Sequence, residues 1–173
     1  MEERAGSLRY LPQLDGLRAL AVAFVLWHHL SRGLWTTAWL AWGWFGVRLF
    51  FVLSGFLITR ILVRERERVL AEEITRKEAL VNFYARRSLR IFPVYYTYVL
   101  IDTIIRMVVF HQDCPALGWY LVYVQNFGFA AGLPAVNLHL WTLAVEEQFY
   151  WFWPLVVLFL PARHLKRAIV AMI

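Results

Sequence analysis

The sequence predicts an all-α fold: a polytopic integral membrane helix bundle of about four transmembrane helices plus a short re-entrant or interfacial segment. Hydrophobic residues make up 61% of the 173 residues, whereas soluble domains contain roughly 45–50%. Aromatic residues make up 17% and include nine Trp, as expected of a protein whose rings lie at two membrane interfaces. The apolar residues gather in runs of the ~20 residues that cross a bilayer. Basic links separate these runs, so we interpret the net charge of +6 as setting membrane orientation rather than binding nucleic acid.

The apolar runs predict four spans, which cover approximately residues 17–34, 44–63, 91–110 and 140–160. The first is expected to be retained rather than cleaved, because no small-residue cleavage site follows it. Residues 116–132 are apolar but too short to span, which favours a re-entrant or interfacial segment.

The link 64–90 is rich in Arg and Glu, which predicts a solvated, largely helical segment. Within it, Thr75 and Glu78 have the spacing of a capping box that begins a helix. Pro93 is expected at the start of the next helix, where proline is tolerated.

The distribution of Lys and Arg predicts the orientation of the spans. Eight basic residues lie in link 64–90 and three in 161–167, but none in 35–43 or 111–139. Because basic links stay on the cytoplasmic side, the N-terminus is predicted to be cytoplasmic, in a multi-pass protein of the plasma or inner membrane.

Ionisable residues within the spans are candidates for function, because they are costly in a membrane. His29 lies about 16 Å along the helix from Arg18, and Glu146 lies ~9 Å into the fourth span. The two can therefore lie at similar depth. Either His29 is a general base oriented by Glu146, or a His–Glu hydrogen bond ties two helices together. His28 faces ~100° away from His29.

Other polar and small residues have a structural and a functional interpretation. Arg87 and Arg90 either contact anionic lipid or bind the phosphates of a donor. Asp102 and Arg106 have the i, i+4 spacing of a neutralising pair, and Ser54 with Gly55 suits close helix packing. The single cysteine, Cys114, is interpreted as a packed residue, and no metal site is predicted.

Four motifs, in this order, resemble those of the acyltransferase-3 family of membrane-bound O-acyltransferases and together extend over almost the whole chain. The first is LDGLRA at 14–19, with ten residues between Arg18 and His29. The others are FGV at 45–47 with FFVLSGFLIT at 50–59, FYARRSLRIFP at 83–93, and HLWTLAVEEQFY at 139–150.

The resemblance implies transfer of an acyl group, often acetyl, from acyl-CoA to a hydroxyl of a carbohydrate or related acceptor, with no bound cofactor. By motif position, it implies that Arg18, Arg87 and Arg90 bind the donor and that His29 is catalytic. Glu146 is predicted to act with His29, and the supporting residues are Ser54, Gly55, Glu147 and Gln148.

The resemblance also implies how the chain is organised, because the family's domain is about twice this length. Residues 1–173 are expected to form its N-terminal portion, with membrane lipids and either the remaining C-terminal helices or another membrane subunit as partners. Two other functions remain open on sequence: a transporter-like module that uses the intramembrane charges, and a non-catalytic assembly module.

Overall fold

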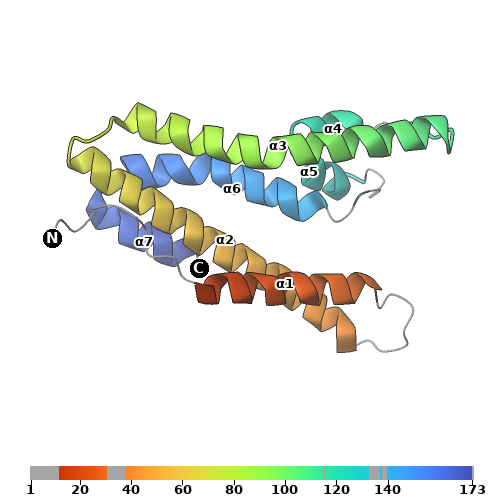
Figure 1. Cartoon of the computed structure of the whole chain (residues 1–173), viewed down its shortest axis with the longest axis horizontal. Helices are drawn as coiled ribbons and strands as arrows, with labels where there is room; N and C mark the ends of the chain where they lie inside the picture. The colour runs from red at the N-terminus through yellow and green to blue at the C-terminus, as the bar shows by residue number, and fades with distance from the viewer. Residues whose placement is uncertain (1–11, 31–37, 115, 133–136, 138–139, 173) are drawn as a thin grey trace. The chain divides into compact units, whose positions relative to one another are not determined.

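The structure is a computed structural model that describes residues 12–30, 38–114, 116–132, 137 and 140–172. The side chains of residues 28–30, 38–41 and 171–172 lie outside this description. The described residues form seven helices and no strand (Figure 1), which confirms the predicted all-α class. The chain divides into two compact units, one formed by 1–64 with 166–173 and the other by 65–165.

The first unit contains α1 (Pro12–Leu30), the greater part of α2 (Ala38–Leu70) and the end of α7 (Ala162–Met172). The helices α1 and α2 approach most closely at Gly46, where an added Cβ would lie 2.7 Å from the carbonyl oxygen of Ala21. Beside this contact the ring of Phe24 stacks on Trp42, with 5.2 Å between centroids. A glycine is therefore required in the FGV motif because α1 backbone occupies the space of a side chain.

The charged link is helical at both ends, as predicted. The helix α2 continues beyond the predicted end of its span to Leu70, with Arg68 bonded to Glu65 at 3.0 Å. After a turn in which Glu72 has a φ of 58°, the predicted capping box begins α3 (Arg76–Val108). The Glu78 N–H donates to Thr75 Oγ1 at 3.2 Å, and the Thr75 N–H donates to the Glu78 carboxylate at 2.8 Å.

The prediction that Pro93 begins a helix is wrong, because α3 is one continuous helix of 33 residues with Pro93 inside it. An internal proline costs about 3 kcal/mol, since its ring crowds the preceding turn and it has no N–H to donate. Contacts on either side hold the helix together across this position. The Tyr84 hydroxyl donates to the Trp151 carbonyl at 2.8 Å, and the Tyr95 hydroxyl donates to the Tyr120 carbonyl at 2.8 Å.

The predicted re-entrant or interfacial segment contains two short helices, α4 (Leu117–Leu121) and α5 (Gln125–Ala130). Neither is long enough to cross a bilayer. They pack on a core in which the rings of Tyr95 and Tyr123 stack with 4.1 Å between centroids.

Side chains donate hydrogen bonds to backbone carbonyl groups in and next to these short helices. Besides the bond from Tyr95, the Tyr96 hydroxyl donates to the Leu121 carbonyl at 3.0 Å. Gln148 donates to the Tyr123 carbonyl at 2.8 Å, and Gln125 donates to the Leu140 carbonyl at 2.9 Å.

The last long helix of the second unit is α6 (Leu140–Phe159), whose bounds match residues 140–160 of the fourth predicted span; that this helix crosses the membrane stays a prediction. Its C-terminal carbonyls at Val157 and Leu160 accept hydrogen bonds of 2.5 and 2.7 Å from the Arg66 guanidinium on α2. A cation suits this position, because the C-terminus of a helix carries partial negative charge. Arg66 therefore joins the charged link to the end of α6.

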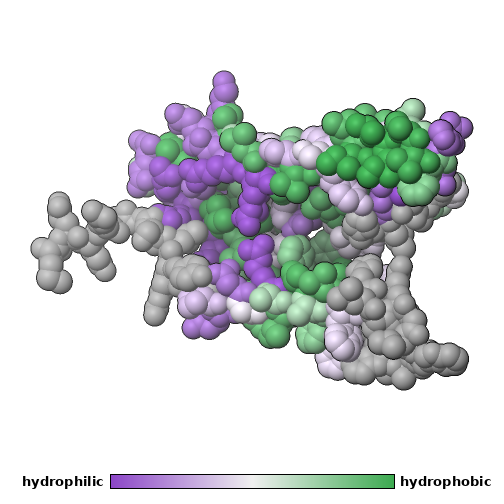
Figure 2. All heavy atoms as spheres, turned by 45° about the vertical axis from the view of Figure 1, so that its right-hand side comes forward, coloured by the Kyte–Doolittle hydropathy of each residue, from purple (hydrophilic) through white to green (hydrophobic). Residues whose placement is uncertain are grey.

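Two helical stretches among the described residues, Trp42–Leu70 and Arg76–Val108, are long and apolar enough to cross a membrane. In the second half of α3, several large apolar side chains are exposed: Leu100, Ile101, Ile104, Ile105, Met107 and Val108. Figure 2 shows apolar side chains gathered toward the end of α3 and hydrophilic ones around the turn between α2 and α3. An exposed apolar surface of this extent suits contact with lipid.

Candidate functional site

Arg87 of the third motif lies against two aromatic rings in the second unit. Its guanidinium carbon is 6.0 Å from the ring centroid of Phe83, four residues earlier on α3, and 5.1 Å from that of Tyr150 on α6. Both distances suit a cation–π interaction. The third and fourth motifs, which are far apart in the sequence, therefore meet at this arginine.

Glu146 is joined to the same ring through the phenol. The Tyr150 hydroxyl donates a very short hydrogen bond to Glu146 Oε1. The two residues are four apart on α6, a spacing that places their side chains together on one face. Glu146 is only 8% exposed, and no described residue hydrogen-bonds its second oxygen. That oxygen remains available to a further donor.

Glu147 and Gln148 differ in their surroundings. Glu147 is 3% exposed, and its Oε1 accepts no hydrogen bond from the described residues. It interacts electrostatically with Glu146 and with Arg87. Gln148 exchanges two amide hydrogen bonds with Asn126, of 2.9 and 3.2 Å, and thus holds α6 to α5.

Besides His29, three of the predicted residues lie in the first unit. Arg18 on α1 lies over the ring of Phe50 on α2, 5.8 Å from its centroid. Ser54 is 5% exposed, and its hydroxyl has no hydrogen-bond partner among the described residues. The Gly55 carbonyl accepts a bond of 2.7 Å from the Thr59 hydroxyl.

Two further predictions have different outcomes. The side chain of His29 lies outside the described residues, so its approach to Glu146 stays a prediction. The pairing of Asp102 with Arg106 is confirmed, with 2.7 Å between Oδ2 and Nε. Within the described part of the chain, no group of three or more His, Cys, Asp or Glu residues is placed to hold a metal ion.

Comparison with known proteins identifies the family. The acyltransferase-3 family, described as an acyltransferase domain, matches residues 11–173. The chain belongs to the acyltransferase-3 family. The motifs that contain Arg87, Tyr150 and Glu146 all lie within the matched part of this acyltransferase domain.

Relatives of this acyltransferase domain include O-acetyltransferases of Listeria monocytogenes and Staphylococcus aureus. One is the peptidoglycan O-acetyltransferase OatA of Listeria monocytogenes, 35% identical over 88% of this chain and 25% of its own length. Another is the O-acetyltransferase OatA of Staphylococcus aureus strain NCTC 8325, 39% identical over 97% of this chain and 28% of its own length. The chain spans about a quarter of the length of these relatives. No solved structure matches it.

The arrangement in this acyltransferase domain holds a carboxylate in a defined position. The Tyr150 hydroxyl holds one oxygen of the Glu146 carboxylate in place, so the second oxygen is suited to accept a hydrogen bond from a base and orient it. Arg87 supplies positive charge beside the phenol ring. The contact of Tyr150 with Glu146 was not predicted from the sequence, although their i, i+4 spacing indicates it. The contact between Arg87 and Tyr150 depends on the packing of α3 against α6, so no local sequence pattern indicates it.

Substitution of Tyr150 tests whether its hydroxyl holds Glu146. Tyr150→Phe keeps the ring beneath Arg87 but removes the donor from a buried carboxylate, so we expect a loss of about 1–3 kcal/mol in unfolding free energy. The measurement is denaturant unfolding of the purified protein in detergent. The matched change Tyr84→Phe removes a hydrogen bond to a backbone carbonyl, leaves no buried carboxylate without its donor, and should cost less. Equal losses in the two variants would contradict this role for Tyr150.

Proposed function

We propose that this protein is a membrane O-acyltransferase that moves an acyl group, acetyl in the simplest case, from acyl-CoA to a hydroxyl of a carbohydrate. Family membership supports the reaction class, and the name of the Listeria relative supports a glycan such as peptidoglycan as acceptor. We also propose that residues 1–173 form the N-terminal portion of a single acyltransferase domain. This portion would act with further membrane helices, on the same chain or on another subunit.

The contact of Arg87 with Tyr150, and of Tyr150 with Glu146, carries the proposal. It links a motif suited to binding phosphate with a carboxylate suited to orienting a base. In the proposed reaction His29 takes the proton of the acceptor hydroxyl, and the oxygen attacks the thioester carbonyl. The CoA thiolate leaves and recovers a proton from the imidazolium. Glu146 orients the His29 ring through its second oxygen and stabilises the imidazolium.

The roles of the arginines follow from their chemistry. A guanidinium offers a planar fork that matches phosphate oxygens, so Arg18, Arg87 and Arg90 are proposed to bind the phosphates of acyl-CoA. Arg87 already rests on two rings, which restricts its motion, whereas Arg90 is exposed on α3. Arg90 is therefore the group best placed to change partners when the donor binds.

The reaction is tested with membranes of cells that express the complete gene. Radiolabelled acetyl-CoA and purified peptidoglycan are added, and base-labile label in the glycan is measured. The proposal predicts label that depends on expression of the gene. Uptake of a solute by the same vesicles without any need for acyl-CoA, and without labelled glycan, would favour a transporter instead.

Substitution of His29 tests the proposed base. In this assay His29→Ala should lose a factor of roughly 10²–10⁴ in turnover, as expected for removal of a general base, while the amount of protein in the membrane is unchanged. His28→Ala is the matched control and should retain turnover, because one helical position turns a side chain by about 100° from that of His29. Glu146→Gln should lose less than His29→Ala, since it keeps a polar partner without the charge. Equal losses in the two histidine variants would indicate general damage to α1.

Replacement of Arg90 by lysine tests donor binding. Lysine keeps the positive charge and hence the membrane orientation, but it loses the planar fork. Arg90→Lys should therefore raise KM for acetyl-CoA and leave KM for the glycan unchanged. Arg86→Lys, an exposed neighbour on α3, is the matched control. An unchanged KM for acetyl-CoA in Arg90→Lys would limit this motif to a topological role.

We further propose four spans with the N-terminus and link 64–90 in the cytoplasm and residues 111–139 outside. Cys114 is the single cysteine of residues 1–173, so in a protein that carries no other cysteine a membrane-impermeant thiol reagent should label it in intact cells. A variant with Cys114→Ala and Glu72→Cys should react only after the membrane is opened. Labelling at position 72 in intact cells would reverse the orientation.

A further inference from the structure

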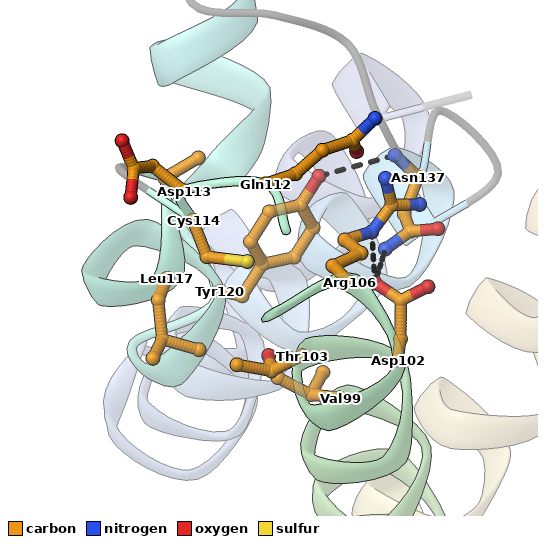
Figure 3. Close-up of a pocket in the computed structure, with 11 residues that line it drawn as sticks. Val99, Asp102, Thr103, Arg106, Gln112, Asp113, Cys114, Leu117, Tyr120 and Asn137 are labelled. Carbon is orange, nitrogen blue, oxygen red and sulfur yellow. Dashed lines mark hydrogen bonds and ion pairs between the residues drawn. The ribbon is translucent and has the colours of Figure 1, made fainter. Parts of the chain in front are cut away.

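A pocket of about 330 Å³ lies in the second unit, where α3 ends and the chain turns into α4 (Figure 3). The sequence motifs do not include it. The second half of α3, the segment after it, α4 and Asn137 line the pocket. Its volume is at the small end of the roughly 300–1,000 Å³ typical of small-ligand sites.

One wall of the pocket is polar and held in place by its own hydrogen bonds. Asp102 Oδ2 accepts from Arg106 Nε and from Asn137 Nδ2, both at 2.7 Å. The Asn137 backbone N–H donates to the Tyr120 hydroxyl at 3.3 Å. Figure 3 shows these groups drawn together around the Asp102 carboxylate. A ligand would therefore meet a fixed arrangement of donors and acceptors.

Two groups on this wall keep hydrogen-bonding capacity for a ligand. Arg106 bonds Asp102 through Nε, and its two terminal amino groups have no hydrogen-bond partner among the described residues. The side-chain amide of Gln112, which also lines the pocket, makes no hydrogen bond within the described part of the chain. These groups offer several donors and one amide acceptor.

The remaining wall is apolar, and the charges limit the ligand further. Val99, Ala116, Leu117 and the ring of Tyr120 contribute apolar surface. Asp102 and Asp113 oppose the single charge of Arg106, which gives the lining a formal net charge of −1 and disfavours an anion. A neutral ring with hydroxyls at its edge and C–H groups on its faces fits both walls.

We propose that this pocket binds one neutral sugar unit of the acceptor glycan; this inference rests on the proposed function. In the proposed topology the third span ends at about residue 110. This places the pocket at the membrane surface beside the link 111–139. In the proposed topology that link is outside the cell, on the side of cell-surface polysaccharides. The pocket positions the acceptor chain and takes no part in the chemical step.

Cys114 provides a test that does not depend on acyl transfer. It lines the pocket and is half-buried, so a sugar that fills the pocket should shield its thiol. The experiment follows the rate of reaction of the protein in membranes with N-ethylmaleimide, without acyl-CoA, over a concentration series of N-acetylglucosamine. The rate should fall to a plateau as the sugar concentration rises. Glucuronate and cyclohexanol should protect less, because the first is an anion and the second has one hydroxyl.

Gln112→Ala removes a ligand-binding group without removing any side-chain hydrogen bond within the described protein. The sugar concentration for half-protection should rise about threefold to tenfold, the equivalent of one hydrogen bond. Gln13→Ala, the same change at an exposed position on α1, should leave it unchanged.

Three outcomes would overturn the proposal: no protection by N-acetylglucosamine, equal protection by cyclohexanol, or the same behaviour in Gln112→Ala and Gln13→Ala. The failures of the two proposals are distinguishable. Protection without any labelled glycan in the transfer assay would refute the acyltransferase and keep the sugar site. Transfer without protection would keep the enzyme and place the acceptor elsewhere.

Discussion

Hydrogen bonds from side chains to backbone carbonyl groups hold the second unit together where its helices are interrupted. A short helix leaves backbone acceptors at its end, and in apolar surroundings each one costs free energy unless a donor reaches it. Here Tyr95 and Tyr96 from α3 and Gln148 from α6 donate to carbonyl groups in and just after α4. Gln125 from α5 donates to the carbonyl of Leu140, the first residue of α6. The same bonds that satisfy the backbone therefore fix α3, α4, α5 and α6 against one another.

This packing brings functional groups together that the sequence keeps apart. Because α3 and α6 lie in one unit, Arg87 reaches Tyr150, and Tyr150 in turn holds Glu146. Aromatic residues thus have two tasks, since their faces support a guanidinium and their hydroxyls bind carbonyl or carboxylate oxygens. Gln148 lies in the same motif as Glu146, but it holds α6 to α5 and to the Tyr123 carbonyl. Neighbouring residues of one short motif therefore have separate roles.

The sequence predicted features that depend on local pattern. Hydrophobic runs indicated the helices, the i, i+3 spacing of Thr75 and Glu78 indicated the capping box, and the i, i+4 spacing of Asp102 and Arg106 indicated the ion pair. The features that were not predicted depend on tertiary contacts. Pro93 lies inside a helix because distant contacts hold α3 on both sides of it, and Asn137 joins Asp102 across 35 positions in the chain. Neither effect leaves a periodic signal.

The fastening of α6 at both ends has a consequence for how this domain can vary. Gln125 bonds the carbonyl of Leu140 at its start, and Arg66 bonds those of Val157 and Leu160 at its end. Between these two anchors the helix behaves as a spacer of fixed length. One inserted residue would lengthen it by about 1.5 Å and rotate everything beyond by about 100°, separating Tyr150 from Arg87 or the last turn from Arg66. Variation along α6 is therefore expected as substitutions, with insertions and deletions confined to the loops.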